Sequence, residues 1–73
     1  MARFKIEINK SGFKNGVPFE KGMSVEVIVL HNSNPIIQNN GKEVRNAFLR
    51  IYGIDLKKIG LLNLSYLTAT KIS

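Results

Sequence analysis

The fold of this chain is decided by the stretch Val17-Pro-Phe-Glu-Lys-Gly-Met-Ser-Val-Glu-Val-Ile-Val29. It begins as a short extended arm, turns at Lys21-Gly22 and continues over Met23–Leu30 as the strongest strand pattern in the sequence. Alternate residues of that strand are apolar and fall on one face: Met23, Val25, Val27 and Val29. Because such alternation needs a hydrophobic layer to lie against, the stretch predicts a sheet and a core. It predicts no chemistry.

The other face of this strand loses its polarity toward the end, where Ile28 and Leu30 stand. We therefore expect the end of the strand to be buried on both faces, or to lie beneath a helix. The following segment, His31–Pro35, has the composition of a loop. The apolar pair Ile36-Ile37 inside the linker is expected to plug one end of the core.

Two further strands are expected before this one. In Arg3–Lys10, alternate apolar residues face inward: Phe4, Ile6 and Ile8. Asn15-Gly16 is a dipeptide preferred in tight reversals, because both residues tolerate positive φ, and we expect it to lead into a short strand over Val17–Glu20. Pro18 lacks an N–H donor, so this strand is expected at a sheet edge or with an irregularity.

The hydrophobic period changes from two residues to that of a helix near Asn40. From Gly41 to Tyr52 a single apolar stripe is expected: Val44, Ala47, Phe48, Ile51 and Tyr52. Asn39 or Asn40 is expected to cap its start, and Gly53 its end in the left-handed conformation. Asp55 is then expected to cap a short helix, Leu56–Ile59, which ends at Gly60.

A last strand is expected over Tyr66–Ile72. Its pattern does not decide which face of the strand points into the core. If Leu67 and Ala69 point inward, the threonines point outward. Pairing of this strand with the first, with a meander of strands between them, completes an α+β fold in the order β-β-β-α-β. The sheet is expected to be small, curved and mainly antiparallel, covered by one main helix plus a short helical turn. Residues 1–73 are expected to form a single small domain, because the chain contains no linker long enough to separate two.

The composition narrows the class of protein. With no cysteine, neither disulfides nor thiolate metal sites stabilise the fold. The hydrophobic residues, 44% of the chain, must therefore do so, or a partner subunit must help. The first residues alternate charged and apolar side chains, unlike a signal peptide, and the longest apolar run, Val27–Leu30, is too short to cross a bilayer. We therefore expect a cytoplasmic protein with no membrane partner.

The acidic residues and the one histidine argue against an enzyme. The five carboxylates are spread one to an element: Glu7, Glu20, Glu26, Glu43 and Asp55. Glu7 and Glu26 lie on outward faces of strands that are potential neighbours, but nearby lysine and arginine residues are placed to neutralise them in cross-strand ion pairs. His31 has no second histidine or cysteine with which to form a zinc site. No catalytic residue, metal ligand or cofactor is therefore expected.

The basic residues suggest one function. Eleven lysines and arginines against five acids give a net charge of +6, which favours polyanionic partners. Five basic residues on the helix surface and just beyond it form a candidate sequence-independent nucleic-acid site: Lys42, Arg45, Arg50, Lys57 and Lys58. The aromatic residues left for stacking bases are Phe13, Phe19 and Tyr66. The alternative is that the charge only solubilises the protein.

Surplus apolar residues favour a rival interpretation, a protein-interaction or assembly module. They exceed what one sheet face and one helix need: Ile28, Leu30, Ile36, Ile37, Leu61, Leu62 and Leu64. In a small domain such residues mark a homodimer contact or a docking groove for a protein partner, or they close the core. The edge strand near Pro18 is also able to accept a strand from a partner.

Three motifs together resemble a known family: Ser11-Gly-Phe-Lys-Asn-Gly-Val17, Phe19-Glu-Lys-Gly-Met-Ser-Val-Glu-Val27 and Tyr52-Gly-Ile-Asp-Leu-Lys-Lys58. The family consists of small uncharacterised proteins of gut bacteria of the Bacteroides group, catalogued as a domain of unknown function. The resemblance covers most of the chain and implies a stand-alone bacterial domain; it transfers no catalytic or binding residue. The sequence thus favours a non-enzymatic binding or adaptor protein that acts through protein-protein interaction. The alternative is nucleic-acid binding through the basic helix face.

Overall fold

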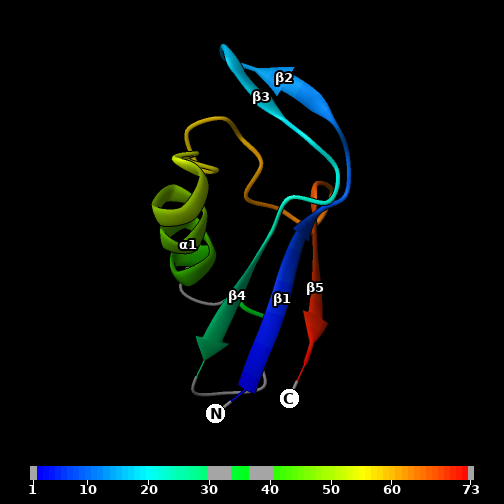
Figure 1. The fold of residues 1–73 in the computed structure, drawn as a ribbon, viewed down its shortest axis with the longest axis vertical. Coiled ribbons are helices and arrows are strands. Elements are labelled where there is room, and N and C mark those ends of the chain that lie inside the picture. The colour runs from blue at the N-terminus through cyan, green and yellow to red at the C-terminus, as the bar shows by residue number, and fades with distance from the viewer. Residues whose placement is uncertain (1, 30–33, 37–40, 73) are drawn as a thin grey trace.

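The computed structural model describes residues 2–29, 34–36 and 41–72. It contains five strands and one helix in that part of the chain: β1 (Ala2–Ile8), β2 (Gly12–Lys14), β3 (Val17–Phe19), β4 (Ser24–Val29), α1 (Lys42–Tyr52) and β5 (Leu67–Lys71). The helix lies beside β4, and the β2–β3 hairpin projects beyond one end of the main sheet (Figure 1). The predicted class is confirmed: the protein has a small α+β fold with antiparallel sheets.

The main sheet has the strand order β4-β1-β5, and both of its strand pairs are antiparallel. The predicted pairing of the last strand with the first is confirmed, because Phe4 lies opposite Lys71 and Ile8 opposite Leu67. The expected meander is wrong. The strand around Pro18 does not lie between β1 and β4, since β1 pairs directly with β4 from Ala2 opposite Val29 to Glu7 opposite Ser24.

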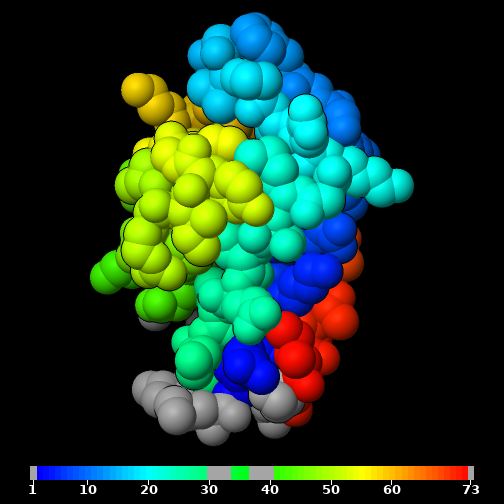
Figure 2. Space-filling view, viewed as in Figure 1, coloured from blue at the N-terminus to red at the C-terminus, as the bar shows by residue number. Residues whose placement is uncertain are grey.

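The segment between β1 and β4 forms a second sheet, the β2–β3 hairpin. Its turn is the predicted Asn15-Gly16, with φ of 48° and 80° at the two residues, as a two-residue turn of this kind requires. The strand β2 was not predicted. Pro18 lies opposite Phe13 in this two-stranded sheet, where each strand is an edge and a missing N–H is tolerated. The hairpin forms the blue and cyan end of the space-filling view (Figure 2).

The core lies between α1 and one face of the main sheet. The predicted inward faces of β1 and β4 are buried, and α1 contributes three buried residues, Val44, Ala47 and Phe48. The prediction that Ile51 completes the buried stripe is wrong, because its side chain is 56% exposed. The buried residues belong to the first two turns, so the packing ends before the helix does. Tyr52 is partly exposed, but its hydroxyl accepts from the Ser24 N–H at 3.1 Å and donates to the Ser24 carbonyl at 3.0 Å.

The outer face of β4 is open to solvent. Ile28 is 60% exposed, so the expectation that the end of this strand is buried on both faces, or covered there by the helix, is wrong. The helix covers the opposite face, which carries Val25 and Val27. Leu30, named with Ile28 in that expectation, lies outside the described residues.

The chain leaves α1 through the predicted left-handed cap. Gly53 has φ of 71°, its N–H donates to the Leu49 carbonyl, and the Ile54 N–H donates to the Phe48 carbonyl. At the start of the helix the N-cap residue is Gly41, and the predicted caps Asn39 and Asn40 lie outside the described residues.

Residues 56–60 form consecutive turns where a short helix was expected. The predicted capping role of Asp55 is confirmed, because its Oδ1 accepts the N–H groups of Lys57 and Lys58 at 3.2 and 3.3 Å. Apolar residues of this region and of the linker close the core, which accounts for part of the apolar surplus: Ile36, Ile54, Leu56, Ile59 and Leu61 are buried and Leu62 is half-buried. Leu64 stays exposed, and Ile37 lies outside the described residues. No helix in the described part of the chain is long and apolar enough to span a membrane.

Candidate functional site

The predicted basic helix face is divided in the structure. Lys42 and Arg50 are exposed near opposite ends of α1, about 12 Å apart along the helix axis at the usual rise per residue. Arg45, which lies between them, is half-buried and faces Asp55. The helix therefore does not present its three basic residues as one continuous surface for phosphates.

Arg45 and Asp55 form a bidentate ion pair that joins α1 to the segment after it. Nε of Arg45 donates to Oδ1 of Asp55 and Nη2 donates to Oδ2, both at 2.9 Å. These hydrogen bonds from Arg45, helped by the N–H groups of the following turn, lower the pKa of Asp55 to about 2. The pairing commits Nε and Nη2 of Arg45 to a structural contact while the side chain remains 40% exposed, so the expected role of Arg45 toward a ligand stays a prediction.

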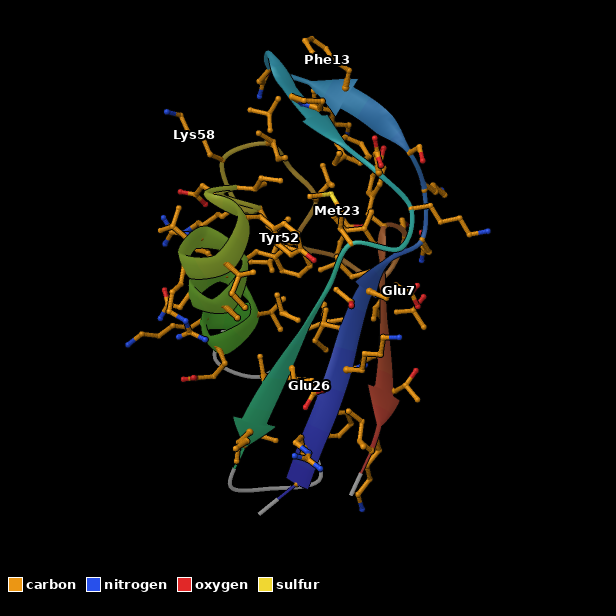
Figure 3. The ribbon with its side chains drawn as sticks, viewed as in Figure 1. Glu7, Phe13, Met23, Glu26, Tyr52 and Lys58 are labelled. Atoms are coloured by element: carbon orange, nitrogen blue, oxygen red, sulfur yellow. The ribbon has the colours of Figure 1, made fainter. Side chains whose placement is uncertain are left out.

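Lys57 and Lys58 are exposed on the turn after Asp55, beside the tip of the hairpin. The contact that fixes this arrangement is a hydrogen bond from Nδ2 of Asn15 to the carbonyl of Lys58, at 3.4 Å. In Figure 3 the Lys58 side chain and Phe13 lie at the same end of the molecule. The topology thus separates Lys57 and Lys58 from Lys42 and places them near the basic residues of the hairpin.

Two hairpin lysines converge on one aromatic ring. The Nζ atoms of Lys14 and Lys10 lie 4.4 and 5.2 Å from the centroid of the Tyr66 ring, within the range of cation–π attraction. A hydrogen bond from Lys14 and the charges of both lysines lower the pKa of the Tyr66 hydroxyl. Tyr66 precedes β5, so residues from both ends of the chain meet at this ring.

We name the four lysines Lys10, Lys14, Lys57 and Lys58 the hairpin-end cluster. Among the described residues, the ion pairs within 4.0 Å are Arg3 with Glu26 and Arg45 with Asp55. No lysine of the cluster is therefore paired with a carboxylate in the described part of the chain. The cluster is a region of positive charge that the protein itself does not neutralise.

The three aromatic residues considered for base stacking have different environments. Phe19 is buried, which corrects the expectation that it is exposed, and its ring meets that of Tyr66 edge-on at 6.0 Å. Tyr66 is half-buried beneath the two lysines. Phe13 is 69% exposed, the most exposed large apolar residue described.

The arrangement of the hairpin explains these differences. Phe19 lies opposite Gly12, and a Cβ atom at position 12 would stand 2.9 Å from Cζ of Phe19. The glycine therefore gives the Phe19 ring the room to close over β2. Phe13 and Pro18 are neighbours on the other face of the hairpin, which looks away from the core.

Lys10 and Lys14 were not predicted as site residues. Their signal was one aromatic residue between two basic ones in Lys10-Ser-Gly-Phe-Lys14, directly before the Asn15-Gly16 turn. Tyr66 gave no such signal, because only the pairing of β1 with β5 brings it to this place. Of the predicted site residues, the structure brings together Lys57 and Lys58 and leaves Lys42 apart.

The outer face of the main sheet forms a second candidate surface. The strand registers place Glu26, Lys5 and Thr70 side by side in one row, with Ser24, Glu7 and Thr68 in the next. Arg3 lies opposite Ile28 and accepts a backbone hydrogen bond from Ile72, so the two exposed isoleucines flank it. We name these nine residues the outer sheet face: Arg3, Lys5, Glu7, Ser24, Glu26, Ile28, Thr68, Thr70 and Ile72.

Of the two carboxylates on the outer sheet face, Glu26 has basic neighbours and forms an ion pair. Nε of Arg3 lies 3.8 Å from Oε1 of Glu26, and Lys5 is directly opposite Glu26. Glu7 lies opposite Ser24, and Figure 3 shows both glutamates on the sheet. Within the residues that the structure describes, no group of three histidine or acidic side chains is placed to hold a metal ion. His31 lies outside these residues.

Comparison with known proteins identifies the family of the chain. No curated protein and no solved structure matches it. Residues 1–69 match a family whose description is "Family of unknown function (DUF6140)". The match covers nearly the whole sequence and includes the hairpin, β1, β4 and the first three residues of β5. The chain therefore belongs to the DUF6140 family of unknown function.

Proposed function

We propose that this protein is a non-enzymatic binding protein that binds nucleic acid independently of sequence through the hairpin-end cluster. The observation that carries the proposal is the convergence of Lys10 and Lys14 on the Tyr66 ring. Among the described residues no carboxylate lies within 4.0 Å of either ammonium group. A bound phosphate would supply the missing negative charge, and its binding would release counterions from the nucleic acid.

The cluster fits a chain of phosphates better than a single anion. Lys57 and Lys58 extend the positive region past the hairpin tip, to which the Asn15 hydrogen bond joins them. Four lysine contacts predict that log K falls with log salt concentration with a slope of about −3.6 for duplex DNA and about −2.8 for a single strand. Such binding needs no base-specific contact, in keeping with the absence of a sequence-reading motif.

The test compares two double variants with the same change in charge. Lys10→Gln/Lys14→Gln removes two cations from the cluster, and Lys42→Gln/Arg50→Gln removes two from the helix. Fluorescence anisotropy with a labelled oligonucleotide is measured over a series of salt concentrations. We expect the hairpin variant to reduce the magnitude of the salt slope by about 1.4 to 1.8, and the helix variant to change it much less. Equal slopes for the wild type and the hairpin variant would contradict the proposal.

Only part of the basic helix face predicted from the sequence belongs to the proposed nucleic-acid interface. Lys57 and Lys58 belong to the proposed interface, whereas Arg45 is engaged with Asp55. If the helix double variant abolished binding and the hairpin variant did not, the original interpretation of the helix face would be correct. We further propose a bacterial, cytoplasmic protein, of the kind implied by the resemblance to proteins of the Bacteroides group.

A second candidate function, protein assembly, is favoured by the outer sheet face. This face carries two cations and two carboxylates, so it has no net charge although the whole chain has +6. Ile28 and Ile72 are exposed at one end of it. A second copy of the chain is a suitable partner. Two cationic molecules repel each other least when they meet through faces without net charge, and the apolar residues of this face would be buried in the contact.

The assembly candidate is tested by light scattering after gel filtration. We expect the wild type to form a dimer at high concentration, and Ile28→Lys to remain a monomer because it adds a charge to the contact. Ile51→Lys is the matched control, since Ile51 is similarly exposed on α1. A wild type that stays monomeric at every concentration would exclude this candidate.

A further inference from the structure

We infer that Phe13 is a base-stacking residue and that the preferred ligand is a single-stranded nucleic acid. This inference rests on the proposed function, because the hairpin-end cluster supplies the phosphate contacts. Phe13 is 69% exposed on the hairpin face turned away from the core. A phenylalanine in this position gives no buried contact to the folded chain, so its ring is open to a ligand.

The hairpin that carries Phe13 is held firmly to the domain. On its inner face Phe19 is buried and contacts Tyr66, and at its tip Asn15 donates to the Lys58 carbonyl. At its base the Gly22 N–H donates to the Ile8 carbonyl. Because the hairpin is held in this way, its backbone loses little freedom when a base stacks on Phe13, which is the advantage of a preorganised surface.

The charges at this end of the molecule indicate the chemical class of the ligand that would carry the stacked base. Phe13 stands between Lys10 and Lys14 in sequence but on the opposite face of β2 from Lys14, and the turn that follows Lys14 contacts the segment of Lys57 and Lys58. The two acids nearest in sequence lie away from the hairpin tip, because Glu7 belongs to β1 and Glu20 follows β3 at the base of the hairpin. A ligand that combines a flat apolar ring with repeated negative charge is therefore complementary to this end of the molecule, and a nucleic acid strand has both features.

The same geometry favours a single strand over a duplex. In a duplex each base is stacked between its neighbours, and its flat face is not accessible to an exposed side chain without unstacking. An unpaired base turns its face to Phe13 at no such cost. Duplex DNA is still able to contact the lysines, so we expect it to bind through phosphates alone.

The experiment uses the absence of tryptophan from the chain. In Phe13→Trp the new indole is the single tryptophan, and stacking of a base quenches its fluorescence. Three probes of matched charge are titrated: a single-stranded thymidine oligonucleotide, a duplex and inorganic polyphosphate. We expect strong quenching with the single strand and little with the other two. Ile51→Trp, at a similarly exposed position on α1, is the control and is expected to show no quenching.

Affinity provides an independent readout. Phe13→Leu keeps an apolar side chain but removes the aromatic face, and we expect it to weaken single-strand binding by about 5- to 150-fold. Its affinity for polyphosphate should not change. If the oligonucleotide binds with a normal salt slope but Phe13→Trp is not quenched and Phe13→Leu binds as well as the wild type, the stacking inference is wrong and the proposed function stands. If neither nucleic acid nor polyphosphate binds, both are wrong.

Discussion

Truncation of Phe48 to alanine tests whether α1 stabilises the fold through its packing on the main sheet. Phe48 is fully buried, and its ring is stacked on Tyr52 at a centroid distance of 5.5 Å. Removal of a buried phenylalanine ring typically costs about 3–5 kcal/mol, since it combines lost burial with a residual cavity. A domain of this length is expected to have a free energy of unfolding of only about 4–11 kcal/mol. The substitution therefore removes a large fraction of the total.

The matched control is Phe13→Ala, the same chemical change on the exposed face of the hairpin. Because Phe13 has almost no buried contact, we expect a change within about 0.5 kcal/mol. Urea unfolding followed by far-UV circular dichroism measures both variants, and thermal unfolding should show Phe48→Ala lower in Tm by roughly 12–40 °C. The reasoning fails if Phe48→Ala costs less than about 1 kcal/mol, or if the two variants are equally destabilised.

Two further predictions concern a charge and a close contact. The pKa of Asp55 in the folded protein, about 2, lies below its ordinary value of 3.8, so its ionisation stabilises the fold above pH of about 4 and this contribution is lost as the pH falls toward about 2. We expect the Tm difference between wild type and Asp55→Asn to shrink through that window; a difference independent of pH would contradict the role of the ion pair. Gly12→Ala places a Cβ atom 2.9 Å from the buried ring of Phe19, and we expect urea unfolding to show a loss of about 1–3 kcal/mol. The usual preference of strands for alanine over glycine has the opposite sign, so a stabilised variant would show that the ring moves aside freely.

Local signals in the sequence were sufficient for most of the individual elements, but not for β2 or for the turns over residues 56–60. The alternation in β1 and β4, the Asn15-Gly16 turn and the Gly53 cap each depend on a few neighbouring residues, and the structure contains all of them. The inward position of Leu67 in β5 is also resolved, since it is buried while Thr68 is exposed. These features follow from backbone conformation and burial at one position.

The arrangement of the elements depends on distant contacts and was predicted less well. The sequence indicates that β3 is an edge strand, but not that it pairs with β2 in a separate hairpin. The direct pairing of β1 with β4 leaves no place for it in the main sheet. Similarly, the helical period places Ile51 on the apolar side of α1, but it cannot give the length of the surface that the helix covers.

Prediction of the candidate site was limited in the same way, because local patterns were found but contacts between distant residues were not. Five basic residues near α1 were predicted as one site from their spacing. In the structure a contact with Asp55 engages Arg45, and a contact with Asn15 joins the Lys58 segment to the hairpin. The convergence of Lys10 and Lys14 on Tyr66 depends on the registers of β1 and β5. A ligand surface assembled from two ends of a chain has no local pattern, so the sequence alone did not indicate it.

The central position of β1 makes the main sheet depend on a pairing between distant parts of the chain. Ile8 in β1 pairs with Leu67, and the segment Leu67–Lys71 is synthesised well after β1. Until that segment has been made, one edge of β1 in the nascent chain stays unpaired and is able to associate with other chains. The long sequence separation of the pair also slows completion of the main sheet.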